Sequence, residues 1–534
     1  MKKSALAFAV ILGVTSTSAS AFDYFFQTGR SAGYGSAGTT YAHWSAAANY
    51  NPALMGAASG AKSTEDFFVV LPNVRGNLVT SKSVDDINDI FKDFEELNDE
   101  FDQMDNIDLL EGDINELNRN IELSNDMLDQ VQELDGLGAH GGFGGGLALG
   151  VSFKSFAVGF HINTQFSGGG SANVSEADIA LFRRFTDLGQ TLLDDVRPLY
   201  DQAVLIENDL LEKEQALLQN QDAYNTLINS GNTDPATIAQ AQDLINSSRD
   251  LVDAAQIQYD QALDLADQAK VAQTTVENEF GDIFDVESQS VTFQTDDLAS
   301  NGRFAGIGWF EVGSTIGTKW DLKSGKTVSA GVTLKSVHLE FFDYVASVAS
   351  LDTGNIDGDD YRNQVDFATA DLGIIVGLDN KDKWRIGATV KNISGETIKS
   401  NPLRLPEGVE ALTFEVEPQV RVGTSYNGGW FRLAADVDVT HASGPLMADG
   451  TEFFQGSQYV NLGAVINAWD FIELRGGYRH NLASADVASD AEASSGLITM
   501  GAGLFLGPIQ ADIALQASPD ADEIGFGFQT MITF

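Results

Sequence analysis

The chain ends on the stretch Ile524-Gly-Phe-Gly-Phe-Gln-Thr-Met-Ile-Thr-Phe534, in which larger apolar and smaller or polar side chains alternate. In a strand, one face of this stretch would carry Ile524, Phe526, Phe528, Thr530, Ile532 and Phe534. Such alternation over about ten residues is typical of a transmembrane β-barrel strand. The alternative, an edge strand of a soluble sandwich, would leave a long Phe-rich edge open to aggregation in water. Because a closed barrel in lipid has no such edge, the stretch favours a barrel.

Both ends of the chain predict export to the outer membrane of a Gram-negative bacterium. Residues 1–21 have the basic start, short apolar core and small-residue end of a secretory signal peptide, so we expect the mature chain to begin near Ala21 or Phe22. At the other end, we expect Phe528, Ile532 and Phe534 to form the C-terminal signal that barrel-assembly machinery recognises. The lipid of the outer membrane would then surround the barrel.

The composition excludes several classes of protein. The 534 residues include no Cys, which excludes thiol redox chemistry, Cys-ligated metals and disulfides. Beyond the leader, no run approaches the roughly 18 apolar residues of a membrane-spanning helix. Most of the formal net charge of −46 lies in residues 84–135, with 19 Asp and Glu against 2 Lys and Arg, and in residues 175–287, with 23 against 6. Nucleic acid is not an expected partner, because phosphate binding needs clustered Lys and Arg.

Alternation and turn residues predict a barrel of about 14 antiparallel strands, formed by residues 61–83, 136–174 and 288–534. The predicted strands are 66–76, 143–153, 156–166, 304–317, 327–341, 365–378, 383–393, 413–427, 430–440, 457–467, 471–481, 496–506, 508–517 and 524–534. Their connections alternate between short and long. Since bacterial barrels have short periplasmic turns and long outer loops, both termini are expected in the periplasm.

The two acidic segments, 84–135 and 175–287, predict an inserted α-helical coiled-coil subdomain. Apolar residues recur at 3-4 spacing through 84–135, 199–228 and 236–280, which gives three helices of about 45–50 residues and favours a left-handed coiled coil. The stretch 236–280 has Ala266 among its seam positions, and Asp234-Pro235 should cap its start. The insertion is either a projecting rod that binds a protein partner or a solvated bundle that only caps the barrel. It lies outside the cell if strand 66–76 exists, and in the periplasm otherwise.

Several blocks of sequence resemble known barrel families. A Gly- and Ala-rich segment leads to Asn51-Pro52-Ala53-Leu54, and Phe67-Phe-Val-Val-Leu-Pro72 follows; Glu417–Gly423, Ala434–Asp438 and Leu474–Tyr478 are further blocks. Together they resemble the FadL family of outer-membrane hydrophobic-compound transporters and, more closely, the TraF-type plasmid-transfer barrel proteins. The resemblance implies that residues 22–60 plug the lumen, with a tight turn at Asn51, Pro52 and Ala53, and that a small hydrophobic compound is the ligand. The acidic segments are larger than those of FadL itself.

Strand alternation also predicts which charges face the lumen. A charge facing lipid near the bilayer midplane would cost about 2–4 kcal/mol, so charged residues in these strands should point inward. The expected lumen charges are Arg385, Arg421, Arg432, Asp436, Asp438, Glu473, Arg475 and Arg479. Because both signs are present, they are expected to form ion pairs that brace the lumen; a polar translocation path is the alternative.

No pattern in the sequence predicts an enzyme, a cofactor or a metal site. The six His are scattered, no nucleophile elbow occurs, and Asp436 and Asp438 have no His beside them in sequence. Three hypotheses of function follow. The first is a FadL-like passive channel for a small hydrophobic compound, with an apolar pocket beneath the plug and a lateral gap or a kinked strand. The others are a TraF-type conjugal-transfer or surface-interaction protein acting through its helices, and a water-filled porin.

Overall fold

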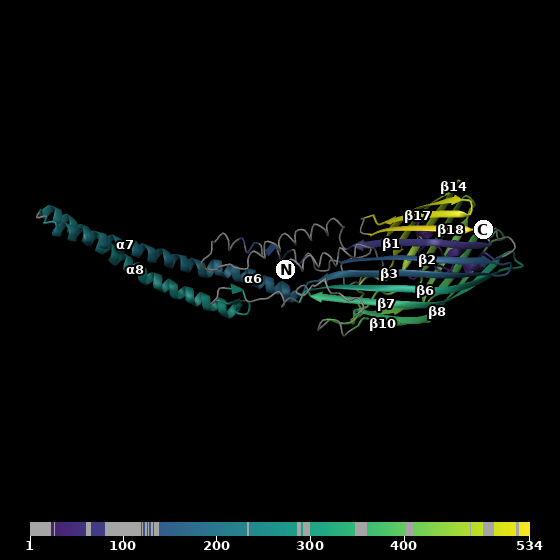
Figure 1. Ribbon diagram of the computed structural model, residues 1–534, viewed down its shortest axis with the longest axis horizontal. Helices are drawn as coiled ribbons and strands as arrows, with labels where there is room; N and C mark the ends of the chain where they lie inside the picture. Colours follow the sequence, from purple (N-terminus) through teal and green to yellow (C-terminus); the bar gives the residue numbers. More distant parts are fainter. Residues whose placement is uncertain are drawn as a thin grey trace. The chain divides into compact units, whose positions relative to one another are not determined.

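The chain forms two compact units, which are considered separately. The computed structural model describes residues 23–25, 27–59, 66–80, 138–231, 234–285, 290–291, 299–347, 360–401, 405, 409–469, 471–483, 496–519 and 523–534, and eight positions between 119 and 132 (Figure 1). The predicted signal peptide and most of the predicted helix over 84–135 lie outside these residues. The first unit is the barrel with its N-terminal segment, and the second is helical.

The first unit is a closed barrel of fourteen antiparallel strands, as predicted (Figure 1). In barrel order the strands are β1 (Phe67–Thr80), β2 (Gly138–Ser152), β3 (Ala157–Asn173), β6 (Asn301–Asp321), β7 (Thr327–Ser347), β8 (Arg362–Gly377), β9 (Trp384–Lys391), β12 (Gln419–Asn427), β13 (Phe431–Asp438), β14 (Tyr459–Trp469), β15 (Ile472–Asn481), β16 (Leu497–Leu506), β17 (Ile509–Ala517) and β18 (Glu523–Thr533). Strand β18 pairs with β1 and closes the ring. Strand β1 is therefore present, and it joins both neighbours.

The last strand shows why the barrel suits lipid. Phe526 and Phe528 are 49% and 40% exposed, whereas their neighbours Gln529 and Met531 are buried inside. At the end of the strand, the Phe534 amide donates to the Phe67 carbonyl at 3.0 Å. Alternation thus places aromatic rings outside and polar groups inside, as in a transmembrane barrel.

Exposed tryptophans mark the end of the barrel that carries the short turns. Trp320, Trp384, Trp430 and Trp469 all lie at or beside these turns, and each is at least half exposed. A belt of aromatic side chains at this level is typical of the boundary between lipid and water. The outward-facing apolar side chains of the barrel begin at the level of these tryptophans.

One predicted strand is wrong. Residues 413–427 do not form a single strand, because the chain leaves the barrel at Glu417-Pro418. Strand β11 (Thr413–Val416) pairs with β10 (Glu396–Lys399) in a separate hairpin, and β12 begins only at Gln419. Pro418 has no amide hydrogen to donate to a ladder, which explains the break. Strands β6 and β7 also extend beyond their predicted ends, to 21 residues each.

The second unit contains one long helix of about 54 residues and a second that packs along it. The first consists of α6 (Glu176–Thr191), a π-helical turn η3 (Leu192–Val196) and α7 (Arg197–Asn229). The prediction that this helix starts at 199 is wrong. Proline normally breaks a helix because it lacks an amide hydrogen, but the widened π-turn directly before Pro198 lets the helix continue.

The second long helix of this unit is α8 (Pro235–Phe280). The Asp234 side chain accepts from the Ala236 and Thr237 amides, so the predicted cap is confirmed. Across the pair, Asn220 Nδ2 donates to Ser248 Oγ at 2.6 Å. Ala266 is exposed, contrary to the prediction, because the buried line shifts to Leu265 after Ala262. None of the helices in the described residues has the length and apolar character to cross a membrane.

The base of the helical unit has its own apolar core. Leu188, Leu192, Val196, Val276, Phe280 and Ile283 are buried together. Ile121, from the first acidic segment, packs against this cluster at Gly189. The two acidic segments therefore share one core. Two short strands, β4 (Phe284–Asp285) and β5 (Ser290–Val291), follow α8.

Candidate functional site

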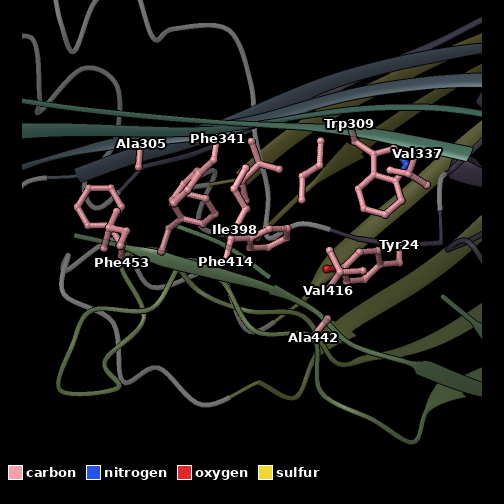
Figure 2. Close-up of a cluster of buried hydrophobic side chains, with 14 residues drawn as sticks. Tyr24, Ala305, Trp309, Val337, Phe341, Ile398, Phe414, Val416, Ala442 and Phe453 are labelled. Atoms are coloured by element: carbon pink, nitrogen blue, oxygen red, sulfur yellow. The ribbon is translucent and has the colours of Figure 1, made fainter. Parts of the chain in front are cut away.

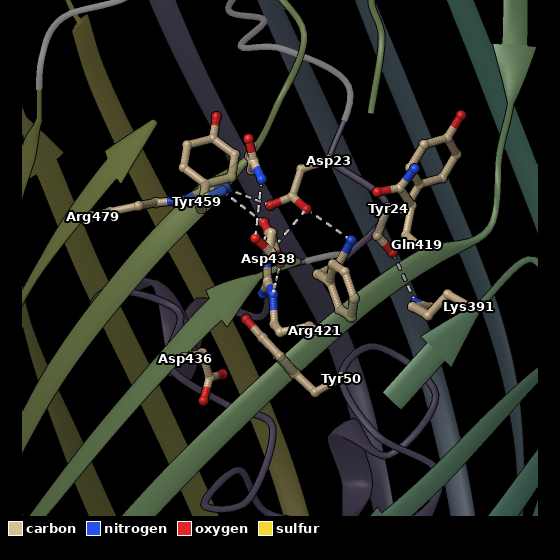
Figure 3. A network of polar contacts seen from close by, with 12 residues as sticks. Asp23, Tyr24, Tyr50, Lys391, Gln419, Arg421, Asp436, Asp438, Tyr459 and Arg479 are labelled. Atoms are coloured by element: carbon tan, nitrogen blue, oxygen red, sulfur yellow. Dashed lines mark hydrogen bonds and ion pairs between the residues drawn. The ribbon is translucent and has the colours of Figure 1, made fainter. Parts of the chain in front are cut away.

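The N-terminal segment lies inside the barrel, where nearly all of its described side chains are buried (Figure 3). We call residues 23–59 the plug. It contains three short helices, α2 (Gly29–Ala32), η1 (Trp44–Ala46) and α3 (Ala53–Ala57). The plug touches opposite walls, since α2 packs on β16 to β18 and α3 packs on β6 to β8. It therefore fills the cross-section of the lumen at this level.

Glycines in the wall allow this close contact. On ten strands, an added Cβ at one glycine would come within 3.1 Å of a plug atom. We call these glycines the glycine belt: Gly159, Gly317, Gly331, Gly373, Gly387, Gly423, Gly463, Gly477, Gly501 and Gly527. Several are direct cross-strand partners, such as Gly463 and Gly477. At most of these positions the backbone of the plug lies directly against the backbone of the barrel, and side chains there would separate the two.

The sequence reasoning missed the glycine belt. Its signal is the presence of glycine on one strand after another, on the face that the alternation assigns to the lumen. A strand-interior glycine often marks the close approach of another backbone. The glycines could therefore have been recognised from the sequence, but the identity of the segment that approaches them could not.

The predicted turn at Asn51, Pro52 and Ala53 joins the plug to the wall. Asn51 Oδ1 accepts from the Ala53 amide at 2.9 Å, which closes the turn. Asn51 Nδ2 donates to the Thr39 carbonyl at 3.0 Å and lies 3.4 Å from the Ile374 and Ala388 carbonyls of β8 and β9. The Asn51 side chain therefore closes the turn and also joins it to the barrel wall.

A buried lysine provides a second anchor. Lys391 Nζ donates to the Tyr24 carbonyl at 2.8 Å (Figure 3) and to the carbonyls of Ala48 and Asn49 at 3.1 and 3.2 Å. It therefore joins the start of the plug to the stretch just before the Asn51 turn. Lys391 has the same strand parity as Arg385, so alternation could have predicted that it faces the lumen, but it was not among the predicted charges.

Four of the predicted lumen charges surround the start of the plug (Figure 3). Arg421 is paired with Asp438, and Arg479 is paired with Asp23 of the plug. Arg421 also lies 3.9 Å from Asp23. The fourth, Asp436, accepts from the amide and hydroxyl of Thr39, both at 2.8 Å.

Aromatic rings complete this arrangement. The Arg421 guanidinium lies 3.8 Å from the centre of the Phe25 ring, and that of Arg479 lies 3.5 Å from the centre of Tyr459. Stacking on an aromatic face stabilises a guanidinium group that is buried away from solvent. The start of the plug is thus held by charge, hydrogen bonds and ring contacts together.

A second group of predicted charges holds α2. Glu473 accepts from Arg475 at 2.7 Å and from Arg30 of the plug at 3.1 Å, and lies 3.5 Å from Arg432. Arg475 also pairs with Asp512 at 2.6 Å. Both groups therefore contain a plug residue, Asp23 in one and Arg30 in the other.

Arg385 does not join the other predicted charges. It is partly exposed and pairs at 2.7 Å with Asp382, in the short turn between β8 and β9. Asp382 also pairs with Lys319 at 3.3 Å. The prediction that Arg385 belongs to a common lumen network is wrong, because it lies at the end of its strand, beside the turn.

A third group of charges was not predicted. Lys335 Nζ lies 3.2 Å from Glu311 and 3.1 Å from Asp371, and all three are buried. Asn163 links this group to the plug, since its Nδ2 lies 2.8 Å from Glu311 and 3.1 Å from Asn49 Oδ1. The same inward parity could have identified these residues in their predicted strands.

Beyond the plug, the inner wall changes from polar to apolar (Figure 2). The inner faces of β6 and β7 and the β10–β11 hairpin bury a set that we call the apolar cluster: Tyr24, Ala305, Ile307, Trp309, Val337, Leu339, Phe341, Ile398, Leu412, Phe414, Val416, Ala442, Phe453 and Phe454. Tyr24 connects it to the plug, with its ring 5.6 Å from that of Trp309 in an edge-on contact. The interior of a water-filled barrel is normally polar. This part of the lumen is not suited to water.

Comparison with known proteins places this barrel in a family. The family model described as "F plasmid transfer operon, TraF, protein" matches residues 48–438. The chain belongs to this TraF family. The predicted resemblance to TraF-type barrels is thereby confirmed. Among curated proteins, no sequence matches this chain.

Solved structures that resemble this TraF-family chain include members of the other predicted family. The toluene transporter TbuX of Ralstonia pickettii is 12% identical, with 96% of this chain and 100% of that chain covered and a TM-score of 0.44. A FadL homologue of Pseudomonas aeruginosa is 9% identical, covering 96% and 99%, with a TM-score of 0.42. The toluene transporter TodX of Pseudomonas putida is 10% identical, covering 96% and 99%, with a TM-score of 0.41.

The described part of this TraF-family chain contains no group of three or more His, Asp or Glu placed to hold a metal ion. Its buried carboxylates instead accept from cations, hydroxyls and amides of the plug and wall. These contacts between the plug and the wall can hold the plug across the lumen.

The start of the plug should respond to acid through Asp23. Burial alone would raise the pKa of this carboxyl, but the charges of Arg479 and Arg421 outweigh burial and hold the pKa below its ordinary value of 3.8. The stabilisation is therefore fully present above about pH 4 and is lost as the pH falls through the lowered folded pKa. We expect Asp23→Asn to unfold at a lower temperature than the wild type at neutral pH, with the gap closing below about pH 4. A gap that persists at low pH would contradict this role.

Proposed function

We propose that this TraF-family protein is an outer-membrane barrel that passes a small hydrophobic compound passively. The observation that carries the proposal is the apolar cluster inside the barrel. Inward positions that would be polar in a porin are Ile307, Trp309, Val337, Leu339 and Phe341, all buried. A site of this kind, mostly apolar with a few polar groups at one end, suits a small apolar ligand.

The compound would enter by replacing part of the β10–β11 hairpin. Ile398 and Phe414 of this hairpin fill the space in front of β6 and β7. The hairpin pairs with itself and not with the barrel wall, so it can move without breaking the barrel ladder. An apolar ligand would take over the contacts of these side chains at Trp309 and reach Tyr24 at the plug.

The compound would leave through the wall beside β1, since the plug and the glycine belt fill the lumen beyond Tyr24. Strand β1 has a register shift against both neighbours, between Leu71 and Asn73 in its pairing with β18 and between Val70 and Asn73 in its pairing with β2. Pro72 lies at this irregularity and cannot donate to either neighbour. Strand β2 opposite contains Gly144, Gly145 and Gly146, which leave little side-chain packing there. A bulge next to such a strand is a natural weak point of the wall.

Topology supports a proposal for orientation. The long insertions connect β1 with β2 and β3 with β6, at the barrel end opposite the short turns. Since short turns face the periplasm in bacterial barrels, the helical unit would lie outside the cell. The C-terminal residues Phe528, Ile532 and Phe534, at the lipid-facing edge, would serve the barrel-assembly machinery.

Binding of an apolar fluorescent probe, 1-N-phenylnaphthylamine, to the purified protein tests the channel proposal. We expect saturable binding to the wild type and a loss of about tenfold or more in affinity for Val337→Glu, which places a charge inside the apolar cluster. Val465→Glu is the matched control. Val465 is also buried and faces the lumen, but it lies between Arg432 and Arg475, outside the cluster. Equal binding by both variants would refute the proposal.

A further inference from the structure

Helix α7 exposes a regular line of apolar side chains that its partner helix does not cover. Val204, Leu211 and Leu218 are 37%, 53% and 60% exposed. They recur every seven residues, so they stay on one side of the helix through two helical heptads. Soluble helices normally place polar side chains on such a face. The exposure of these apolar side chains therefore requires either a binding partner that covers them or another physical reason.

The line is distinct from the seam between α7 and α8. The less exposed seam positions on α7 include Ala203, Leu210 and Leu217, and each exposed residue comes one position later. One residue corresponds to a rotation of about 100° around an α-helix. The exposed line thus lies on the flank of α7, about 100° around the helix from the seam, and its three side chains are exposed.

Carboxylates alternate with the apolar residues on this face. Glu207 and Glu214 follow Val204 and Leu211 by three residues, which gives the order Val, Glu, Leu, Glu, Leu at 3-4 spacing. We call these five residues the α7 stripe. Within the described part of the chain, no cation pairs with either Glu207 or Glu214. Arg197 and Lys213 of α7 are already paired, with Asp201 and Asp209.

The charge around the stripe restricts what can bind to it. Helices α7 and α8 together carry 14 Asp and Glu against 4 Lys and Arg. A second copy of the hairpin would bring the same charges into contact. An apolar surface with basic flanks does not have this problem.

We propose that the α7 stripe binds an amphipathic helix of another protein whose apolar face is flanked by Lys and Arg. Apolar residues of that helix would cover Val204, Leu211 and Leu218, and its basic residues would pair with Glu207 and Glu214. This is the helix-on-helix mode of recognition, in which apolar anchors recur at 3-4 spacing. The assignment is independent of the proposed channel and concerns the helical unit alone.

The test uses the full chain in detergent and a synthetic helical probe peptide with Leu on one face and Lys on its flanks. A second peptide has Glu in place of every Lys. Because the chain has no Cys, Gln215→Cys places one fluorescent or benzophenone label beside the stripe, at an exposed position. We expect the Lys peptide to bind and crosslink at this label, with an affinity that falls as salt rises. The Glu peptide should not bind.

Paired variants show whether the stripe is the site. Leu211→Gln/Leu218→Gln should weaken binding about tenfold or more. Glu207→Gln/Glu214→Gln should weaken it less and reduce its salt dependence. Leu244→Gln/Leu251→Gln is the control, because these α8 residues are similarly exposed, at 53% and 55%, and lie outside the stripe. This control should bind like the wild type.

Four outcomes would overturn the proposal. Equal loss in the control pair would show that any exposed leucine suffices, and equal binding of the Glu peptide would exclude charge recognition. Without peptide, a benzophenone crosslink to a second copy would identify the stripe as a self-association surface. A crosslink to residues 84–118 of the same chain would show that the chain covers its own stripe.

Discussion

Replacing Gly477 by valine is expected to unseat the plug and open the lumen. The new Cβ would collide with the backbone of Tyr34 and Gly35, and the wall cannot yield because the Leu462 carbonyl lies equally close on the same side. Overpacking of a tight contact costs about 1–3 kcal/mol when side chains can adjust, and a backbone contact adjusts less. In planar bilayers, the wild type should be almost silent and Gly477→Val should give frequent, long-lived conductance.

Gly476 is the control for this experiment. It is the next residue of β15 and faces the other way, and a Cβ there would meet only the Thr499 carbonyl, at 3.9 Å. Gly476→Val should therefore remain closed. Both variants are first compared with the wild type for barrel folding by their resistance to detergent at room temperature. A folded, silent Gly477→Val, or equal conductance from both variants, would show that the glycine belt does not seat the plug.

The barrel could be predicted because its physical constraint acts on every strand. A strand between lipid and lumen must alternate. The polarity of Phe526 and of Gln529 therefore indicates which side of the strand each lies on, without knowledge of the neighbouring strands. Strand ends were harder to predict. Residues 168–173 extend β3, yet they are Gly, Ser, Ala and Asn, which do not alternate in hydropathy. The excursion into β10 and β11 was missed because Thr413–Val416 alternates as well as a barrel strand does.

Part of the candidate site could be predicted for the same reason. Arg421, Arg475 and Asp438 stand among lipid-facing neighbours, so their charge forces them inward. The plug partners of Arg479 and Glu473 could not be predicted, because Asp23 and Arg30 approach from a segment more than 400 residues away in sequence. The glycine belt shows the same limit. A glycine within a strand indicates that another segment comes close, but only the folded structure shows that this segment is the plug.

The pair between Asp23 and Arg479 should give the largest change in stability. Both side chains are buried, at 2% exposure each. Asp23→Leu would leave the Arg479 guanidinium without its carboxylate inside the barrel. Removing one partner of a buried pair costs about 3–5 kcal/mol, mostly because the remaining charge is uncompensated. We expect both Asp23→Leu and Arg479→Leu to lower the free energy of unfolding by about this amount, measured by urea denaturation in lipid vesicles.

The double variant Asp23→Leu/Arg479→Leu separates the pair from its surroundings. With both charges gone, no ion remains without a partner, and apolar replacements of a buried pair are often neutral. The double variant should therefore regain most of the stability that either single variant loses, which gives a coupling energy of about 2–3 kcal/mol or more. If the two losses simply add, Asp23 and Arg479 act independently. The plug would then be held mainly by its other anchors, Lys391 at the Tyr24 carbonyl and Asn51 at the barrel wall.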